Sequence, residues 1–106
     1  MQDQHANHIQ ALDKAIKLIQ EAWCKYVLSR RRQGKTHYCL LGAIDEAVQD
    51  ESLGADLKSR IAEKIGEIGE DRPYMDLGDW NDCQGTKSPV IKLLKEVKEE
   101  LEVQAK

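Results

Sequence analysis

The chain contains no phenylalanine, only two prolines, and no apolar run near the roughly 20 residues that a membrane span requires. Its N-terminal residues also lack the basic and then apolar regions of a secretory signal peptide. These absences predict a protein without membrane segments, located in the cytoplasm. Much of the chain consists of alanine, leucine, isoleucine, lysine, glutamate and glutamine, a composition that favours helices over strands.

Cysteine is also scarce. Cys24, Cys39 and Cys83 cannot all pair within one chain, and they show neither CxxC spacing nor the density of a disulfide-rich secreted domain. Together with His37 they supply atoms that zinc prefers, but without a recognisable ligand spacing. The acidic stretch over residues 71–82 fits no EF-hand frame. The sequence therefore predicts reduced thiols, no resident metal and no cofactor.

The length and the charge balance set the class of protein. A chain of 106 residues predicts one domain, and its apolar fraction of 41% is too high for a disordered protein. Its formal net charge of −3 argues against nucleic acid as a general partner, although a local basic patch can outweigh the global sum.

Apolar residues at helical spacing dominate the start of the chain. They form one stripe of six positions: Ile9, Leu12, Ile16, Ile19, Trp23 and Tyr26. The stripe predicts a first helix from about residue 6 to residue 31, after a flexible tail over residues 1–6. Such a helix is about 39 Å long. Because a small globule cannot cover all of it, we expect part of the stripe to form a homodimer interface.

Three further helices are predicted. The second is capped by Thr36 and buries Leu40, Leu41, Ile44, Ala47 and Val48. A turn over residues 50–54 precedes the third, which buries Leu57, Ile61, Ile65 and Ile68 and ends at Gly69. The last begins at Ser88, a favoured cap followed by proline, after an ordered loop over residues 70–87. The expected fold is a compact all-α domain of about four helices over residues 1–106.

The predicted loop contains the triplet Trp80-Asn81-Asp82. Asn and Asp cap turns and bond nearby backbone groups, so turn chemistry explains these residue types without a ligand. The alternative is a ligand loop, in which the adjacent Asn and Asp hold a polar group. Trp80 is too large to leave in water, and we expect it to pin the loop against the helices.

Cys39 and His37 lie near the predicted start of the second helix, where a thiol beside a cation can become nucleophilic. However, residues two apart on a helix do not face each other, and Cys39 adjoins two leucines, as buried cysteines often do. The sequence therefore favours a protein that is not an enzyme, and no residue is assigned as catalytic.

A basic segment lies between the first two predicted helices, and its residues are Arg30, Arg31, Arg32, Lys35 and His37. It is suited to phosphate, RNA or an acidic partner. The simpler interpretation is a solvated helix end, where cations complement the helix dipole. No aromatic residue is interleaved with the arginines, as single-strand binders usually require.

Three short motifs carry a family resemblance: Cys39 to Ala43, Trp80 to Asp82, and Val90 with Leu93 and Leu94. They resemble the C-L-x-G-A, W-N-D and V-L-x-L-L pattern of an uncharacterised family of small bacterial and phage helical domains. The basic segment and Pro89 depart from that pattern.

The resemblance gives no activity. It implies one shared local structure that contains Cys39, Gly42, Trp80, Asn81 and Asp82. In this structure Trp80 is expected to lie on the bare helix surface at Gly42. The Asn-Asp pair is expected to bond backbone near the helix start.

Three functions follow from these patterns. The favoured one is a non-enzymatic interaction or regulatory domain that binds a protein partner through its helical surface. The second is nucleic-acid or phosphate binding through the basic segment. The third is a small-ligand or enzyme site around Asn81 and Asp82, with His37 and Cys39, which requires these side chains to converge in a concave site.

Overall fold

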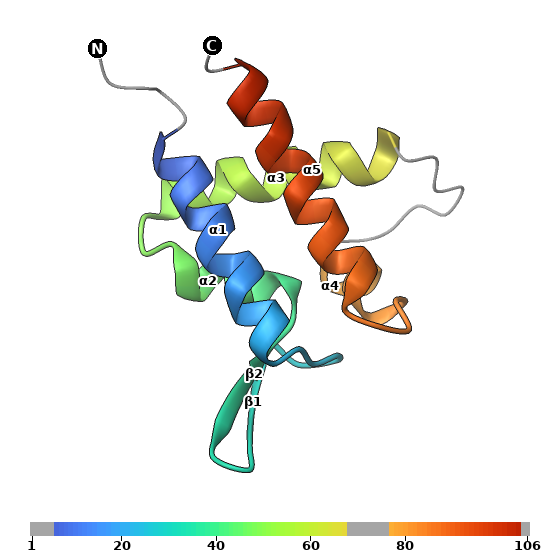
Figure 1. Ribbon diagram of the computed structural model, residues 1–106. Helices are drawn as coiled ribbons and strands as arrows, with labels where there is room; N and C mark the ends of the chain where they lie inside the picture. The colour runs from blue at the N-terminus through green and yellow to red at the C-terminus, as the bar shows by residue number, and fades with distance from the viewer. Residues whose placement is uncertain (1–5, 68–76, 105–106) are drawn as a thin grey trace.

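Two helices that pack side by side, α1 (Ala6–Glu21) and α5 (Ser88–Gln104), form the front of the helical body in Figure 1. The computed structural model describes residues 6–67 and 77–104. Behind them, α3 (Glu51–Glu67) crosses α5, while the short helices α2 (Leu40–Ala47) and α4 (Leu77–Asp82) pack against each other. The radius of gyration is 13.4 Å.

The core contains apolar side chains from all five described helices. Its fully buried members include Leu12, Ile19, Leu40, Ile44, Leu57, Ile61, Trp80, Val90, Leu94 and Leu101. Their helical spacing in α1, α3 and α5 is the pattern that the sequence analysis detected. None of the described helices is long and apolar enough to cross a bilayer.

A two-stranded antiparallel hairpin, β1 (Ser29–Arg32) and β2 (Lys35–Tyr38), projects from the helices at the bottom of Figure 1. Its turn residues, Gln33 and Gly34, have φ angles of 53° and 77°. Two successive positive φ angles are typical of the type I′ turn, whose twist matches that of the paired strands. The fold is therefore mostly α with a small sheet, and the prediction of an all-α protein with four helices was wrong.

The hairpin also explains why the first helix ends at Glu21 and not near residue 31. After the helix, Ala22 and Cys24 exchange backbone hydrogen bonds with Tyr38 of β2, at N···O distances of 2.9 and 3.1 Å. Trp23 and its neighbours are therefore extended. A helix of 16 residues is only about 24 Å long, so the length argument for a homodimer through this helix is lost.

Three local predictions also need correction. Thr36 lies in β2 and the N-cap of α2 is Cys39. The predicted turn over residues 50–54 is the start of α3, where the Asp50 carboxylate accepts a hydrogen bond from Leu53 N at 3.0 Å. Part of the predicted loop over residues 70–87 is helix α4.

The final helix begins at Ser88, as predicted. Predictions for residues 1–5, 68–69 and 70–76 lie outside the described residues.

Candidate functional site

Asn81 is the one buried polar residue within the described part of the chain, and it is 0% exposed. Its Oδ1 accepts hydrogen bonds from Trp23 Nε1 at 2.7 Å and from Leu40 N at 3.2 Å. Its Nδ2 donates to Cys24 O at 3.2 Å and to Asp82 Oδ1 at 3.3 Å. Every polar group of this amide is thus bonded, as a buried amide requires.

Asp82 extends the same contact to the next part of the chain. Its Oδ1 accepts a hydrogen bond from Tyr26 N at 2.7 Å. Tyr26 has a φ of 73°, a conformation that bulky L-residues rarely adopt. We call Asn81 and Asp82 the latch, because together they fix α4 to residues 23–26 and to the first residue of α2.

Cys39 and Gly42 lie beside the latch. Cys39 is 3% exposed, and its Sγ accepts a hydrogen bond from Gly42 N at 3.4 Å, which caps α2. The Cys39 N–H in turn donates to Leu28 O at 3.1 Å. A Cβ built on Gly42 would lie 1.9 Å from that same Leu28 oxygen. Gly42 is therefore needed for the close approach of the Leu28 backbone.

This arrangement changes one expectation and confirms another. The backbone of Leu28 covers Gly42, so the expectation that Trp80 lies there was wrong. Trp80 is 2% exposed in the core, as expected for a residue that pins this segment. The bond from Leu40 N to Asn81 confirms that the Asn-Asp pair bonds backbone near the helix start.

The two buried thiols are poor candidates for nucleophiles. Burial raises the pKa of Cys39, and the bonds from the Gly42 and Leu41 N–H groups offset this only in part. Burial, with the neighbouring Cys39, also raises the pKa of Cys24. Both thiols therefore stay protonated at neutral pH, and the thiolate is the reactive form.

Thiol labelling tests this assignment. In the native protein we expect iodoacetamide at pH 7.5 to modify Cys83, which is exposed, at least about tenfold faster than the two buried thiols, because it meets solvent and they do not. All three should react alike in 6 M guanidinium chloride. Mass spectrometry of tryptic peptides reads the three rates, and rapid native labelling of Cys39 would restore it as a reactive thiol.

The hairpin collects cations on one side. In the register of the two strands Arg30 lies opposite His37, and Arg32 lies opposite Lys35. Alternate residues of a strand share a face, so these four side chains lie on one side, which we call the basic face. Arg31 lies on the other side, where its guanidinium donates to Thr36 Oγ1 at 3.4 Å.

The clustering of positive charge on the basic face lowers the stability of the hairpin. Arg32 and Lys35 are like charges on directly opposed residues, an arrangement that destabilises a strand pair. Residues 24–39 contain five Lys or Arg and no Asp or Glu, whereas the whole chain has a net charge of −3. The remainder of the chain therefore has a net charge of −8, so a positively charged segment is attached to a negatively charged remainder.

A pocket of about 250 Å³ opens where the hairpin meets the segment that follows α1; we call it the hairpin pocket. Its lining residues are Trp23, Cys24, Lys25, Tyr26, Arg30, Arg32 and His37. Basic and aromatic side chains thus share one concave surface. They come from the segment after α1 and from both strands of the hairpin, which lie together because the chain turns back after Glu21.

His37 supplies a second sign of an incomplete site. Its Nδ1 is buried and, within the described part of the chain, has no hydrogen-bond partner. Buried polar atoms in proteins are nearly always paired with protein, water or a ligand. A polar group that enters the hairpin pocket would lie beside this residue.

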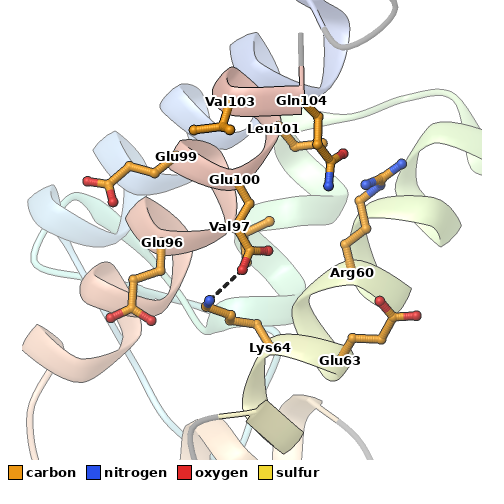
Figure 2. A pocket seen from close by; sticks show the side chains of 10 residues that line it. All are labelled: Arg60, Glu63, Lys64, Glu96, Val97, Glu99, Glu100, Leu101, Val103 and Gln104. Carbon is orange, nitrogen blue, oxygen red and sulfur yellow. Dashed lines mark hydrogen bonds and ion pairs between the residues drawn. The ribbon is translucent and has the colours of Figure 1, made fainter. Parts of the chain in front are cut away.

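A larger concavity of about 560 Å³ lies between α3 and α5 (Figure 2). Lys64 and Glu100 point toward each other across it and form an ion pair. Arg60 is paired with Asp56 at 2.9 Å. Both cations that line this concavity are thus paired with neighbouring carboxylates, as is usual on the solvated face of a helix.

The predicted site residues therefore fall into two neighbouring groups. Asn81 and Asp82 form the latch, with Cys39 and Gly42 beside it, and the basic face lies on the hairpin next to the segments that this latch holds. Trp23 and Tyr26 were not predicted as site residues; they bond the latch and line the same pocket as Arg30, Arg32 and His37. Among the described residues, no cluster of three or more His, Cys, Asp or Glu is suited to hold a metal ion.

A family model described as a family of unknown function, DUF6197, matches residues 4–100. No curated protein and no solved structure matches the chain.

Proposed function

Because the chain belongs to the DUF6197 family, which has no known function, we propose a role from its own surface: a non-enzymatic binding module whose hairpin engages a phosphate-rich partner. The observation that carries the proposal is the basic face, on which Arg30, Arg32, Lys35 and His37 share one side of a projecting hairpin. Guanidinium groups match phosphate oxygens in geometry and charge.

The geometry around the latch supports a binding role over a catalytic one. An enzyme site at Asn81 and Cys39 would need side chains that are available to a substrate. The Asn81 amide is fully bonded inside the protein, and the Cys39 thiol caps a helix. These groups are used to hold the hairpin in place.

Cross-strand repulsion supports the same proposal. A protein gains no stability by placing like charges opposite each other on an exposed hairpin. An anion bound across Arg32 and Lys35 would relieve that repulsion. Residues that violate a local stability rule, such as the avoidance of like charges on opposed strand positions, are often found at functional sites.

Charge reversal tests the proposal with a matched control on the same strand. We expect Arg30→Glu to weaken binding of a fluorescently labelled inorganic polyphosphate chain about tenfold, because it removes a direct phosphate contact. Arg31→Glu makes the same charge change on the opposite side of the hairpin, and it should cost less than about threefold, since salt at 0.15 M screens charges beyond about 8 Å. Fluorescence anisotropy measures both.

The salt dependence provides a second readout. Four phosphate contacts predict a slope of log K against log salt between roughly −2 and −4. Equal losses for the Arg30 and Arg31 variants, or no polyphosphate binding by the native protein at 50 mM salt, would count against the proposal.

A second candidate is a protein partner, which the sequence analysis favoured. It is supported by Val27 and Leu28, apolar residues that are 41% and 55% exposed directly before the hairpin. Exposed apolar residues next to an oriented basic surface are typical of protein docking sites. This candidate predicts that Val27→Asn abolishes capture of a partner that the Arg30→Glu variant still binds.

A further inference from the structure

We propose that the hairpin pocket holds one unstacked base of a single-stranded nucleic acid, with the Tyr26 ring as the stacking surface and the basic face on the phosphates. The inference rests on the proposed function and deepens it, because it names the phosphate-rich partner. It is carried by the shared lining of the pocket, where Trp23 and Tyr26 adjoin Arg30 and Arg32.

Tyr26 is unusual both in exposure and in backbone conformation. Its side chain is 74% exposed, so the ring contributes little to the core. Its φ of 73° suits glycine or asparagine better than tyrosine. The latch nevertheless holds this residue in place through the 2.7 Å bond from Tyr26 N to Asp82. Neither packing nor turn geometry explains an aromatic ring here, whereas a ligand with a flat face does.

The surroundings of the ring match the composition of single-strand binding sites. Such sites combine a positively charged track for the backbone with aromatic side chains on which bases stack. Lys25 Nζ lies 5.3 Å from the centroid of the Tyr26 ring, so a cation is already placed beside it. Arg30 and Arg32 line the same pocket. The aromatic residue that the linear sequence lacks among its arginines is supplied by the fold.

The size and continuation of the site favour a strand over a free nucleotide. The pocket is small, about 250 Å³, which is less than the space that drug-sized ligands occupy. Lys35 lies outside its lining, opposite Arg32 at the hairpin tip. The basic face thus extends beyond the pocket toward neighbouring phosphates. A base within a duplex is stacked on both sides and cannot enter, so the proposed ligand is single-stranded.

The test compares two labelled 20-nucleotide strands, oligo-dT and an abasic strand with the same backbone and no bases. We expect the native protein to bind oligo-dT about tenfold more tightly than the abasic strand, which is the range for one stacked base. Tyr26→Asn should remove this preference and leave binding of the abasic strand unchanged. Asparagine tolerates a positive φ, so the backbone bond to Asp82 is retained.

Val27→Asn is the matched control, because Val27 is exposed, adjacent in the chain and absent from the pocket lining. It should keep the preference for oligo-dT. As a second readout, oligo-dT should change the tryptophan fluorescence, and the abasic strand should not, because Trp23 lines the pocket whereas Trp80, the other tryptophan, is buried in the core. This readout on the native protein does not depend on the folding of any variant.

Three results would overturn the inference. Equal affinity of the native protein for the two strands would exclude a base in the pocket, while polyphosphate binding that depends on Arg30 would still support the proposed function. A 20-base-pair duplex that binds as tightly as oligo-dT would assign the hairpin to double-stranded DNA. A polyglutamate of equal charge that binds as tightly would assign the surface to acidic proteins.

Discussion

Replacing Gly42 with alanine is expected to lower the free energy of unfolding by about 3 kcal/mol, the upper range for overpacking in a buried site. The added Cβ would lie 1.9 Å from Leu28 O, and the obstacle is backbone that cannot rotate aside. That oxygen also accepts the hydrogen bond from Cys39 N, so a shift of Leu28 would disturb the start of α2 as well. Urea denaturation followed by circular dichroism measures the loss.

Gly66→Ala is the matched control for this substitution. Gly66 lies near the end of α3, and a Cβ there would meet nothing within 4 Å. Alanine at this helical position should raise the free energy of unfolding by about 0.5–1 kcal/mol, because glycine is the poorer helix former. A Gly42→Ala protein that loses less than about 0.5 kcal/mol would refute the close approach of Leu28 to α2.

Replacing Asn81 with alanine is expected to cost about 3–5 kcal/mol, the second large effect. The change leaves Trp23 Nε1, Leu40 N and Cys24 O without the partner that each has in the native protein. Each buried group left unpaired costs about 1–3 kcal/mol. Asn81 is 0% exposed, so its truncation also opens a cavity.

The control for Asn81 is Gln84→Ala, which removes one side-chain bond, from Gln84 Nε2 to Trp80 O at 2.8 Å. We expect it to cost about 1 kcal/mol, the usual value for one partly buried hydrogen bond. Comparable losses for the two variants would mean that Asn81 has no special role in joining the segments. Thermal unfolding with both variants in parallel separates these outcomes.

The helices were predictable where apolar spacing is both regular and long. The stripes of α1, α3 and α5 extend over several turns, and the side chains that define them are buried in the core. The apolar stripe that predicts each helix is also the face that the core buries, so local helix preference and tertiary packing favour the same structure. The start of α5 was also found to within one residue, because serine and proline are local signals of a helix start, although Ser88 is the first residue of the helix and not its cap.

The hairpin was not predictable in the same way. Its strands are only four residues long and lack the alternation of apolar and polar residues that identifies a strand, and Trp23 and Tyr26 ahead of them continue the apolar spacing of α1. What holds the strands is nonlocal: Tyr38 N bonds Ala22 O, and Cys39 N bonds Leu28 O. The only local signal was the Gln33-Gly34 pair, which suits a tight turn with positive φ angles.

For the candidate site, the residue types and one of their contacts were identified from the sequence. Turn chemistry placed the contacts of Asn81 and Asp82 within their own segment, while the family resemblance predicted a bond to backbone near the start of α2, which the bond from Leu40 N to Asn81 confirms. The bonds to Trp23 and Tyr26, 58 and 56 positions away, were not predicted. Arg30 and Arg32 were identified, while the aromatic side chains beside them were assigned to a helix face. Tyr26 and Arg30 are only four residues apart in the sequence, but the pocket that they share depends on the hairpin, which returns the chain to the segment after α1.

The length of chain between the latch and its partners has a consequence for the order of folding. The hairpin closes over two residues, whereas the bonds that orient it must close loops of more than 40 residues, at a larger entropic cost. During synthesis the hairpin emerges well before Asn81 and Asp82. Its amides can pair early, but the hydrogen bonds that join residues 23–26 and Leu40 to α4 form only when α4 docks. Exchange of the Leu40 and Tyr26 amide protons would therefore report the last step in maturation of the binding surface.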